Sequence, residues 1–275
     1  MEQIQKNKKN FNRLLIILLI GLIIFAILTH RIFEGVLIIF YIIISIVLLA
    51  VYYYMKITVP FKETVIPAVL QKYKPTLSFS YKLDEKDHYV ELIKNNHLIP
   101  SATSFNFADV IVDEVDGYKT LSADLHATHT QSTGKTTTTI TDFKGRFYDV
   151  EFDKLPCNFI IKEEYYKRNP SGYEFLEFEH IDFNKVFNIY VSDTHEAFKV
   201  FTPSIIKKYH ELAGVDEYKT ILHYENNHLY IYIYNAKNIF EYTNDDYEKI
   251  IIKDYLDQYN DILKYIETFQ YQTLD

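Results

Sequence analysis

The sequence predicts an α+β protein in which a two-helix transmembrane hairpin precedes a cytosolic domain of antiparallel strands and helices. Two long hydrophobic runs near the N-terminus predict the hairpin. Short alternating strands and amphipathic helices follow without a regular strand–helix repeat, which is typical of α+β domains. Of the 275 residues, 48% are hydrophobic and 24% are charged, so we expect a folded core and not a disordered chain.

Residues 14–30 and 35–55 carry no formal charge, and each run is long enough to cross a bilayer as a helix. A cleaved signal peptide also has a basic start and an apolar run, but no small-residue cleavage site follows Leu28 and a second apolar run comes at once. Four cations precede the first run, four follow the second within about 20 residues, and only Arg31 lies between the runs. The positive-inside rule therefore predicts a multi-pass protein of the cell membrane with both termini in the cytoplasm.

The charge of the chain is unevenly distributed. After residue 55 the sequence holds 24 Lys and Arg against 35 Asp and Glu, a net charge of −11. A domain that acidic is repelled by nucleic acid and by anionic headgroups, so we expect no nucleic-acid partner. The expected partners are the lipid bilayer, through residues 14–55, and either an unidentified protein or a second copy of the chain. The single cysteine, Cys157, excludes an internal disulfide and suits a reducing compartment.

Composition and periodicity divide the chain into four expected segments. They are a cytosolic N-terminal tail (residues 1–13), the hairpin (14–55), an amphipathic stalk (56–76) and an acidic α+β domain (77–275). The stalk is predicted because Phe61, Val65 and Val69 recur at helical spacing, and Pro67 is expected to kink it. The acidic domain is long enough for one core or for two lobes, residues 77–172 and 173–275.

The first half of the acidic domain has the period of β-strands. Its alternating stretches are rich in Thr, Tyr, Phe and Val, and they cover residues 77–83, 121–130, 136–143 and 147–152. Residues 131–134, with polar side chains and a glycine, predict the turn of a hairpin.

The second half of the domain mixes strand and helix signals. Residues 187–191 predict a strand, and Asp193 with Glu196 three positions later predicts a helix that starts at Thr194. A second helix is predicted to start at Pro203, because a threonine precedes this proline.

A hairpin and a long helix are predicted after these elements. Residues 219–224 and 228–234 predict the hairpin, with its turn at Asn226 and Asn227. Residues 245–269 predict the helix. Its expected apolar face consists of Ile252, Tyr255, Leu256, Tyr259, Ile262, Leu263 and Ile266.

We expect no catalytic, metal-binding or cofactor-binding residues, because each candidate motif is incomplete. Gly134-Lys135-Thr136 resembles the end of a phosphate-binding loop, but His129 stands where the first glycine is needed and a strand follows instead of a helix. Asp124, His126 and His129 form the best metal-like set. On a strand, however, His129 points away from the other two.

Three tyrosines form a candidate binding stripe on the predicted strand 228–234. Tyr230, Tyr232 and Tyr234 share one face of this strand, and the other face is aliphatic. Stacked tyrosines could hold a ligand or a peptide. We favour the alternative that the strand is central and is covered by helices, which requires two apolar faces.

Two stretches resemble a bacterial family of membrane proteins, the domain of unknown function 3137. One is FKGRF at residues 143–147, and the other is EHIDFNKVF at residues 179–187, which continues through Asp193 and Glu196 to Thr202-Pro203. The resemblance implies the architecture and a membrane location, with paired hydrophobic segments before the domain, but it implies no activity.

Most residues of these stretches have an evident structural role in turns, helix caps or apolar packing. Glu179, Asn184 and Lys185 do not, and they form the candidate polar site of the sequence.

The leading hypothesis is a non-enzymatic membrane protein whose acidic domain binds another protein or assembles with itself. The alternative is a membrane-bound, hydrolase-like enzyme with a polar site near Glu179 and Asn184. A pore built from oligomerised hairpins is disfavoured, because the runs 14–28 and 35–55 have no ionisable residue to line a conducting path.

Overall fold

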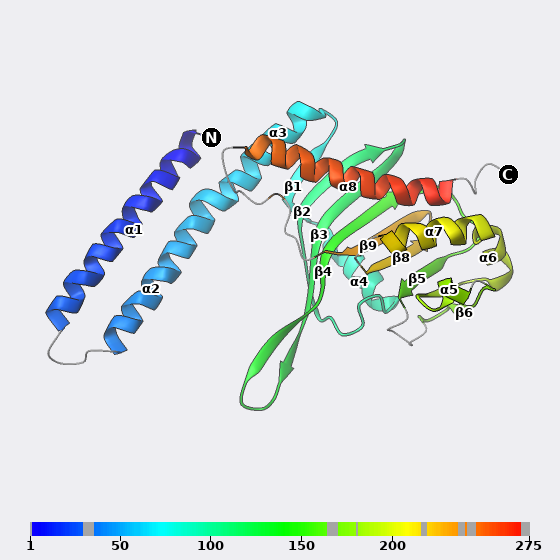
Figure 1. Cartoon of the computed structure of the whole chain (residues 1–275), viewed down its shortest axis with the longest axis horizontal. Coiled ribbons are helices and arrows are strands. Elements are labelled where there is room, and N and C mark those ends of the chain that lie inside the picture. The colour runs from blue at the N-terminus through cyan, green and yellow to red at the C-terminus, as the bar shows by residue number, and fades with distance from the viewer. Residues whose placement is uncertain are drawn as a thin grey trace. The chain divides into compact units, whose positions relative to one another are not determined.

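The computed structural model describes residues 2–29, 36–163, 170–179, 181–215, 219–235, 240 and 246–270. The chain forms two compact units (Figure 1). The first consists of Met1–Val69 with Tyr242–Tyr247, and the second consists of Leu70–Glu241 with Glu248–Asp275. The predicted external connection between the two hydrophobic runs lies outside the described residues.

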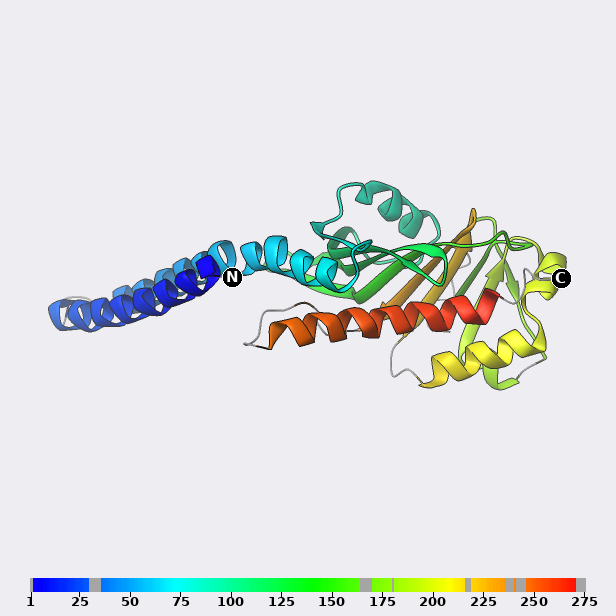
Figure 2. The ribbon, with the colours of Figure 1, turned by 90° about the horizontal axis from the view of Figure 1, so that it is seen from above.

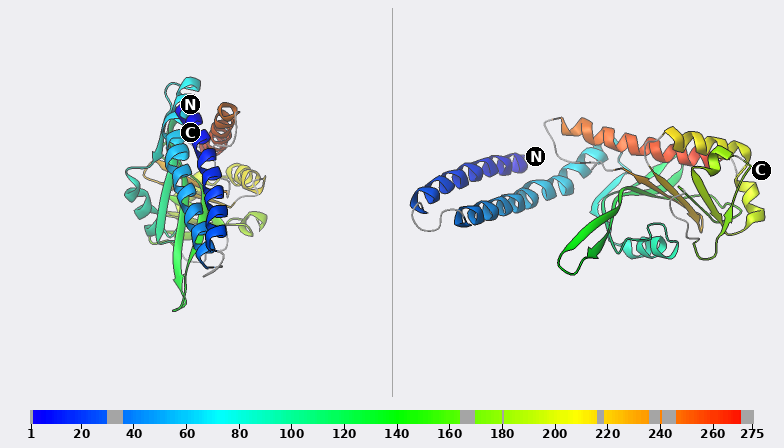
Figure 3. Two further views of the ribbon diagram at one scale, coloured as in Figure 1. Left: turned by 90° about the vertical axis from the view of Figure 1, so that its left-hand side faces the viewer. Right: turned by 60° about the horizontal axis from the view of Figure 1, so that its bottom comes forward.

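The first unit is helical. Helix α1 (Glu2–Thr29) contains most of the first hydrophobic run, and α2 (Val36–Tyr53) contains most of the second. The two helices lie side by side (Figure 3), and the Tyr41 hydroxyl of α2 donates to the Leu18 carbonyl of α1 at 3.4 Å. A Cβ at Gly21 would lie 2.7 Å from the Tyr41 hydroxyl, so a larger residue there would displace the Tyr41 side chain.

The helix of α2 continues through two π-helical turns, η1 (Tyr54–Thr58) and η2 (Phe61–Val65), into α3 (Ile66–Tyr73). Pro60 and Pro67 each follow one of these turns. A proline has no N–H to donate, and its ring clashes with the carbonyl four residues earlier. The helix relieves both conflicts by opening a π-helical turn before each proline.

Among the described residues of the second unit, nine strands form one antiparallel sheet. Their spatial order is β1-β2-β3-β4-β9-β8-β5-β7-β6. The strands are β1 (Ser78–Lys82), β2 (Ser104–Val115), β3 (Tyr118–Ser132), β4 (Thr137–Glu151), β5 (Phe159–Glu163), β6 (Glu174–Leu176), β7 (Phe187–Val191), β8 (Thr220–Glu225) and β9 (His228–Tyr234). Strands from before and after residue 172 therefore share one sheet.

Helices cover both faces of this sheet (Figure 2). Helix α4 (Lys86–Asn95) lies on one face, and α7 (Pro203–Val215) and α8 (Tyr247–Phe269) lie on the other. Two shorter helices, α5 (Ile181–Asn184) and α6 (Thr194–Val200), flank β7 in sequence.

Each face carries its own hydrophobic core, and the central strands supply both. On β5, Phe159 and Ile161 join the core under α7 and α8, whereas Ile160 joins the core under α4. On β9, Ile231 and Tyr232 divide in the same way. A strand covered on both sides is expected to be apolar on both faces, which explains why β5, β7 and β9 are hydrophobic at most positions.

The predicted α+β class is confirmed, and so are most of the predicted elements. The structure has the strand 187–191 as β7, both predicted hairpins, the helices that start at Thr194 and Pro203, and the long helix α8. The Asp193 carboxylate caps α6 as predicted, by accepting from the N–H groups of His195 and Glu196 at 2.8 and 3.0 Å.

Some predictions of local structure were wrong. The expected strands 136–143 and 147–152 are one strand, β4, and neither β2 nor α4 was predicted. Leu256 lies outside the buried face of α8 with 37% of its surface exposed, because the buried face runs through Ile251, Tyr255, Gln258 and Ile262.

Gly145 allows β9 to approach β4 closely at the end of their pairing. A Cβ at this position would lie 2.0 Å from the carbonyl oxygen of Ile233 on β9, so only glycine lets β9 pair here.

We expect Gly145→Ala to destabilise the domain by about 3 kcal/mol, the upper end of the overpacking range. Thermal unfolding followed by circular dichroism measures the change. Thr138→Ala, at an exposed position of the same strand, is the matched control, and equal stability of the two variants would contradict the expectation.

Candidate functional site

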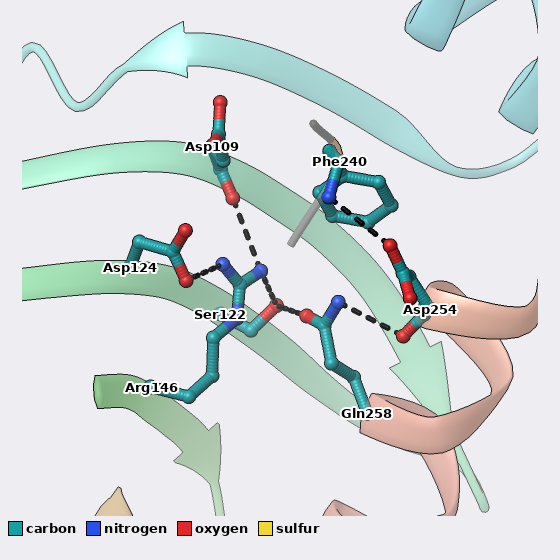
Figure 4. A network of polar contacts seen from close by, with 7 residues as sticks. All are labelled: Asp109, Ser122, Asp124, Arg146, Phe240, Asp254 and Gln258. Atoms are coloured by element: carbon teal, nitrogen blue, oxygen red, sulfur yellow. Dashed lines mark hydrogen bonds and ion pairs between the residues drawn. The ribbon is translucent and has the colours of Figure 1, made fainter. Parts of the chain in front are cut away.

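A buried arginine organises the polar contacts between the sheet and α8 (Figure 4). Arg146 lies on β4 opposite Asp124 of β3, and only 5% of its surface is exposed. Its Nη1 donates to Oδ1 of Asp124 at 2.8 Å, and its Nη2 donates to the Asp109 carbonyl at 3.0 Å and to Oγ of Ser122 at 3.1 Å. The Asp109 carbonyl can reach this site because β2 bulges between Ala108 and Ile111, which gives Asp109 a positive φ of 50°.

The contacts of Arg146 continue onto α8. The Ser122 hydroxyl donates to Oε1 of Gln258 at 3.3 Å, and the Gln258 amide nitrogen donates to the Asp254 carbonyl at 3.1 Å. The Asp254 carboxylate in turn accepts from the Phe240 N–H at 3.1 Å. Burial raises the pKa of Asp254 above its ordinary value, and the Phe240 N–H partly offsets this effect.

A second carboxylate, Asp113 of β2, lies beside this network. Its Oδ2 accepts from the Tyr255 hydroxyl of α8 at 2.6 Å, and its Oδ1 lies 2.7 Å from Nζ of Lys74, the residue that follows α3. Burial is the main cause that raises the pKa of Tyr255, and the hydrogen bond to Asp113 adds to it. Tyr255 is therefore a neutral donor. One buried carboxylate thus connects the sheet, α8 and the segment before β1.

This arrangement fixes positions but offers no chemistry on a substrate. Ser122 accepts from Arg146 and donates to Gln258, so no base activates its hydroxyl. The cavity between Asp113, Ser122 and α8 has a volume of about 10 Å³, room for one water at most. Across the described parts of the chain, no three His, Cys, Asp or Glu side chains are grouped to hold a metal ion.

A second polar cluster lies on the face of α4. The Asp149 carboxylate accepts from the Tyr89 hydroxyl at 2.8 Å and pairs with Nδ1 of His228 at 2.7 Å. The hydrogen bond to Asp149 is the main cause that raises the pKa of His228. The Tyr230 ring stacks on His228, with 5.7 Å between centroids, and also contacts the ring of His223 at 5.5 Å.

His223 is fully buried beneath this cluster. Its Nε2 lies 3.3 Å from the Tyr173 hydroxyl and 3.4 Å from a carboxylate oxygen of Glu225. Burial lowers the pKa of His223 to about 3, so the imidazole is neutral at physiological pH.

The structure places Asn184 of the candidate polar site against the backbone of the preceding segment. The Asn184 side chain binds the backbone of Phe178, accepting from its N–H at 3.4 Å and donating to its carbonyl. Asn184 therefore has a structural role that the sequence did not reveal. Glu179 and Lys185 are both exposed.

The tyrosine stripe is divided between core and surface. Tyr230 and Tyr232 lie in the core beneath α4, where both rings contact Phe147 at 6.3 and 5.1 Å, and only Tyr234 is exposed. The three residues of the metal-like set also have separate partners. Asp124 pairs with Arg146, His126 lies 3.1 Å from the Thr141 hydroxyl, and His129 pairs with Asp142 at 2.8 Å.

The match to a family model covers the part of the chain that supplies Arg146, Asp149, His228 and Gln258. Residues 141–271 match the model of the family described as "Protein of unknown function (DUF3137)". The resemblance expected from FKGRF and EHIDFNKVF is thereby confirmed for this DUF3137 region, which extends from β4 through α8.

Comparisons with curated proteins and with solved structures assign no function to the chain. No curated protein matches the chain. One solved structure, the crystal structure of the mycobacterial trehalose monomycolate transport factor A, TtfA, covers 75% of this chain and 97% of its own at 7% sequence identity and a TM-score of 0.43.

Sequence reasoning missed Arg146 and Gln258 as a connected pair, although two signals were present. Arg146 stands inside FKGRF with large aromatic residues on both sides, and Gln258 interrupts the apolar face of the helix 247–269. A polar residue at a core position must find a partner. Asp113 gave no such signal, because its strand was not predicted.

We expect Arg146→Met to destabilise the domain by about 3 kcal/mol, because it leaves Asp124, Ser122 and the Asp109 carbonyl without their shared donor. Thermal unfolding in detergent measures the loss. Lys119→Met is the matched control, because the exposed Lys119–Glu151 pair at 3.3 Å is worth less than about 1 kcal/mol. Equal losses in the two variants would contradict the assigned role of Arg146.

We expect the free energy of unfolding of the domain to fall in mild acid because of His223. The unfolded chain binds a proton at His223 below a pH of about 6.5 and the folded chain does so only near pH 3, so stability is lost as the pH falls through this window. Between pH 7.5 and 5 the loss is about 2 kcal/mol. Melting curves of the wild type and His223→Gln measure it, with His126→Gln as an exposed-histidine control. Parallel pH profiles of wild type and His223→Gln would count against a buried, neutral His223.

Proposed function

We propose that this chain is a multi-pass protein of the cell membrane that presents an acidic α+β domain for binding another protein or for self-assembly. Residues 14–55 cross the bilayer as a two-helix hairpin, and both termini lie in the cytoplasm. The acidic domain thus lies at the inner surface of the membrane.

The observation that carries this proposal is an apolar helix whose most apolar stretch is almost entirely exposed. Within the described residues, the helix over Ile39–Tyr73 is long and apolar enough to cross a membrane, and its most apolar stretch is only 6% buried. A core helix of a soluble domain would be mostly covered. A helix that is apolar on all sides and uncovered is stable in lipid and not in water.

The described side chains of α1 support a second span. Ile17, Ile20 and Ile23 are each more than half exposed, although they belong to the charge-free run. The residues 14–28 favour insertion by about 5 kcal/mol or more, at roughly 0.3 to 0.6 kcal/mol for each Leu, Ile, Phe or Val. Tyr41 is the one tyrosine before residue 52. The pairing of α1 with α2 gives its hydroxyl a hydrogen-bond acceptor, the Leu18 carbonyl.

The charge of the domain supports a protein partner. With a net charge of −11 after residue 55, the domain is repelled by the anionic inner leaflet and stays accessible from the cytoplasm. No contact among the described residues favours the hydrolase alternative near Glu179, because the amide of Asn184 is used by the backbone of Phe178.

Cysteine labelling tests the topology directly. We expect a membrane-impermeant maleimide to label Glu34→Cys in intact cells, and to label the exposed Gln3→Cys only after the cells are permeabilised. The native Cys157 is buried and serves as the background. Labelling of Gln3→Cys in intact cells, or release of the protein by alkaline carbonate, would contradict the two-span arrangement.

A further inference from the structure

Strands β3 and β4 extend beyond their neighbours in the sheet as a two-stranded arm. Strand β2 last pairs with β3 at Thr128, and β9 last pairs with β4 at Gly145. Residues 129–141, which we call the arm, project from the sheet (Figures 1 and 3), and their strands pair only with each other. The arm ends in a tight turn, where the Thr133 N–H donates to the Thr136 carbonyl at 3.0 Å and Gly134 has a φ of +81°.

The composition of the arm suits strand pairing. Seven of its residues are threonine, and residues 130–139 are all exposed. Threonine is β-branched and favours strands. Soluble proteins protect an open strand edge with charges, prolines or bulges, but the strands of the arm carry no Asp, Glu, Lys, Arg or Pro, and Lys135 lies in the turn. A lone two-stranded hairpin is only marginally stable in water.

The register shows which backbone groups are open. Thr133 and Thr136 form a hydrogen-bonded pair, so the next pair, Ser132 and Thr137, points its N–H and C=O groups outward. The pattern alternates, and Thr139 therefore also points outward. The Thr128 carbonyl agrees with this alternation, because it faces β2 and accepts from the Thr103 N–H at 2.9 Å.

We propose that the β4 edge of the arm, residues 137–141, pairs with the same edge of a second copy of this chain. The pairing is antiparallel about a two-fold axis at Thr139. Thr139 then faces its own copy and Thr137 faces Thr141, so that three pairs each exchange both N–H···O bonds. This inference rests on the proposed function and specifies its self-assembly.

The choice of a second copy follows from charge and symmetry. Two domains that each carry a net charge of −11 repel each other over most of their surface, but the arm contains no acidic residue and projects away from the sheet. An antiparallel edge is also complementary to itself about a two-fold axis, which is the commonest symmetry of homo-oligomers. Threonine pairs across strands add to the stability of such an edge.

Thr139→Pro tests the open edge. Proline removes the outward N–H of residue 139 but none of the hydrogen bonds between β3 and β4, as at a sheet edge. We expect the full-length wild type and Thr139→Val to have the mass of a dimer in mild detergent, measured by light scattering after size exclusion. We expect Thr139→Pro to be a monomer with an unchanged circular dichroism spectrum. A dimeric Thr139→Pro would overturn the proposal.

Disulfide crosslinking in membranes provides a test that needs no proline. We expect oxidised Thr139→Cys to form a covalent dimer, and Ser101→Cys, an exposed control away from the arm, to form none. No dimer from Thr139→Cys, or a crosslink only to a different protein, would overturn the proposal. Carbonate extraction of the same samples separates this result from the membrane proposal, because crosslinking can be read whether or not the chain is released.

Discussion

The guanidinium of Arg146 is the group on which the packing of α8 against the sheet depends. A buried charge is tolerated only where it is paired and hydrogen-bonded, and here the acceptors come from two strands, β2 and β3. Asp124 and Ser122 must stand in register on β3, and the bulge in β2 must turn the Asp109 carbonyl inward. Gln258 then links α8 to the same set through Ser122. A shift of one residue in the pairing of β3 with β4 would separate Arg146 from Asp124, so the charge specifies the register as well as the packing.

The parts of the fold that could be predicted from the sequence are those whose stability is local. Asp193 caps α6 through two N–H groups within three residues, and the turn at Asn226 and Asn227 joins strands that are adjacent in the chain. The polar network could not be predicted, because its partners lie far apart: 142 residues separate Asp113 from Tyr255, and 136 separate Ser122 from Gln258. Strand β2 was missed for the same reason. Asp109 and Asp113 suggest a solvated loop until the residues that pair with them are known.

The sheet carries polar groups of different kinds on its two faces. On the face of α8, Arg146 and Lys74 compensate the carboxylates Asp124 and Asp113, and the contacts exclude all but a very small cavity. On the face of α4, a histidine meets Asp149 instead, and His228 is partly exposed. The hydrogen bond to Asp149 raises the pKa of His228, and burial lowers the pKa of His223. Both histidines lie on the face of α4, so a response to mild acid is expected in the packing of this face.

The distribution of acidic residues along the chain determines which parts of the domain two copies can bring together. The domain has 35 acids after residue 55, and their net negative charge favours solubility but causes repulsion between copies. Residues 129–141 do not contribute to this repulsion, because they contain no Asp or Glu. Copies held by residues 14–55 in one bilayer would also share a plane, which raises their effective concentration without any new contact. In the proposed arrangement, a small strand edge that is too weak to join soluble domains would be sufficient to join anchored ones.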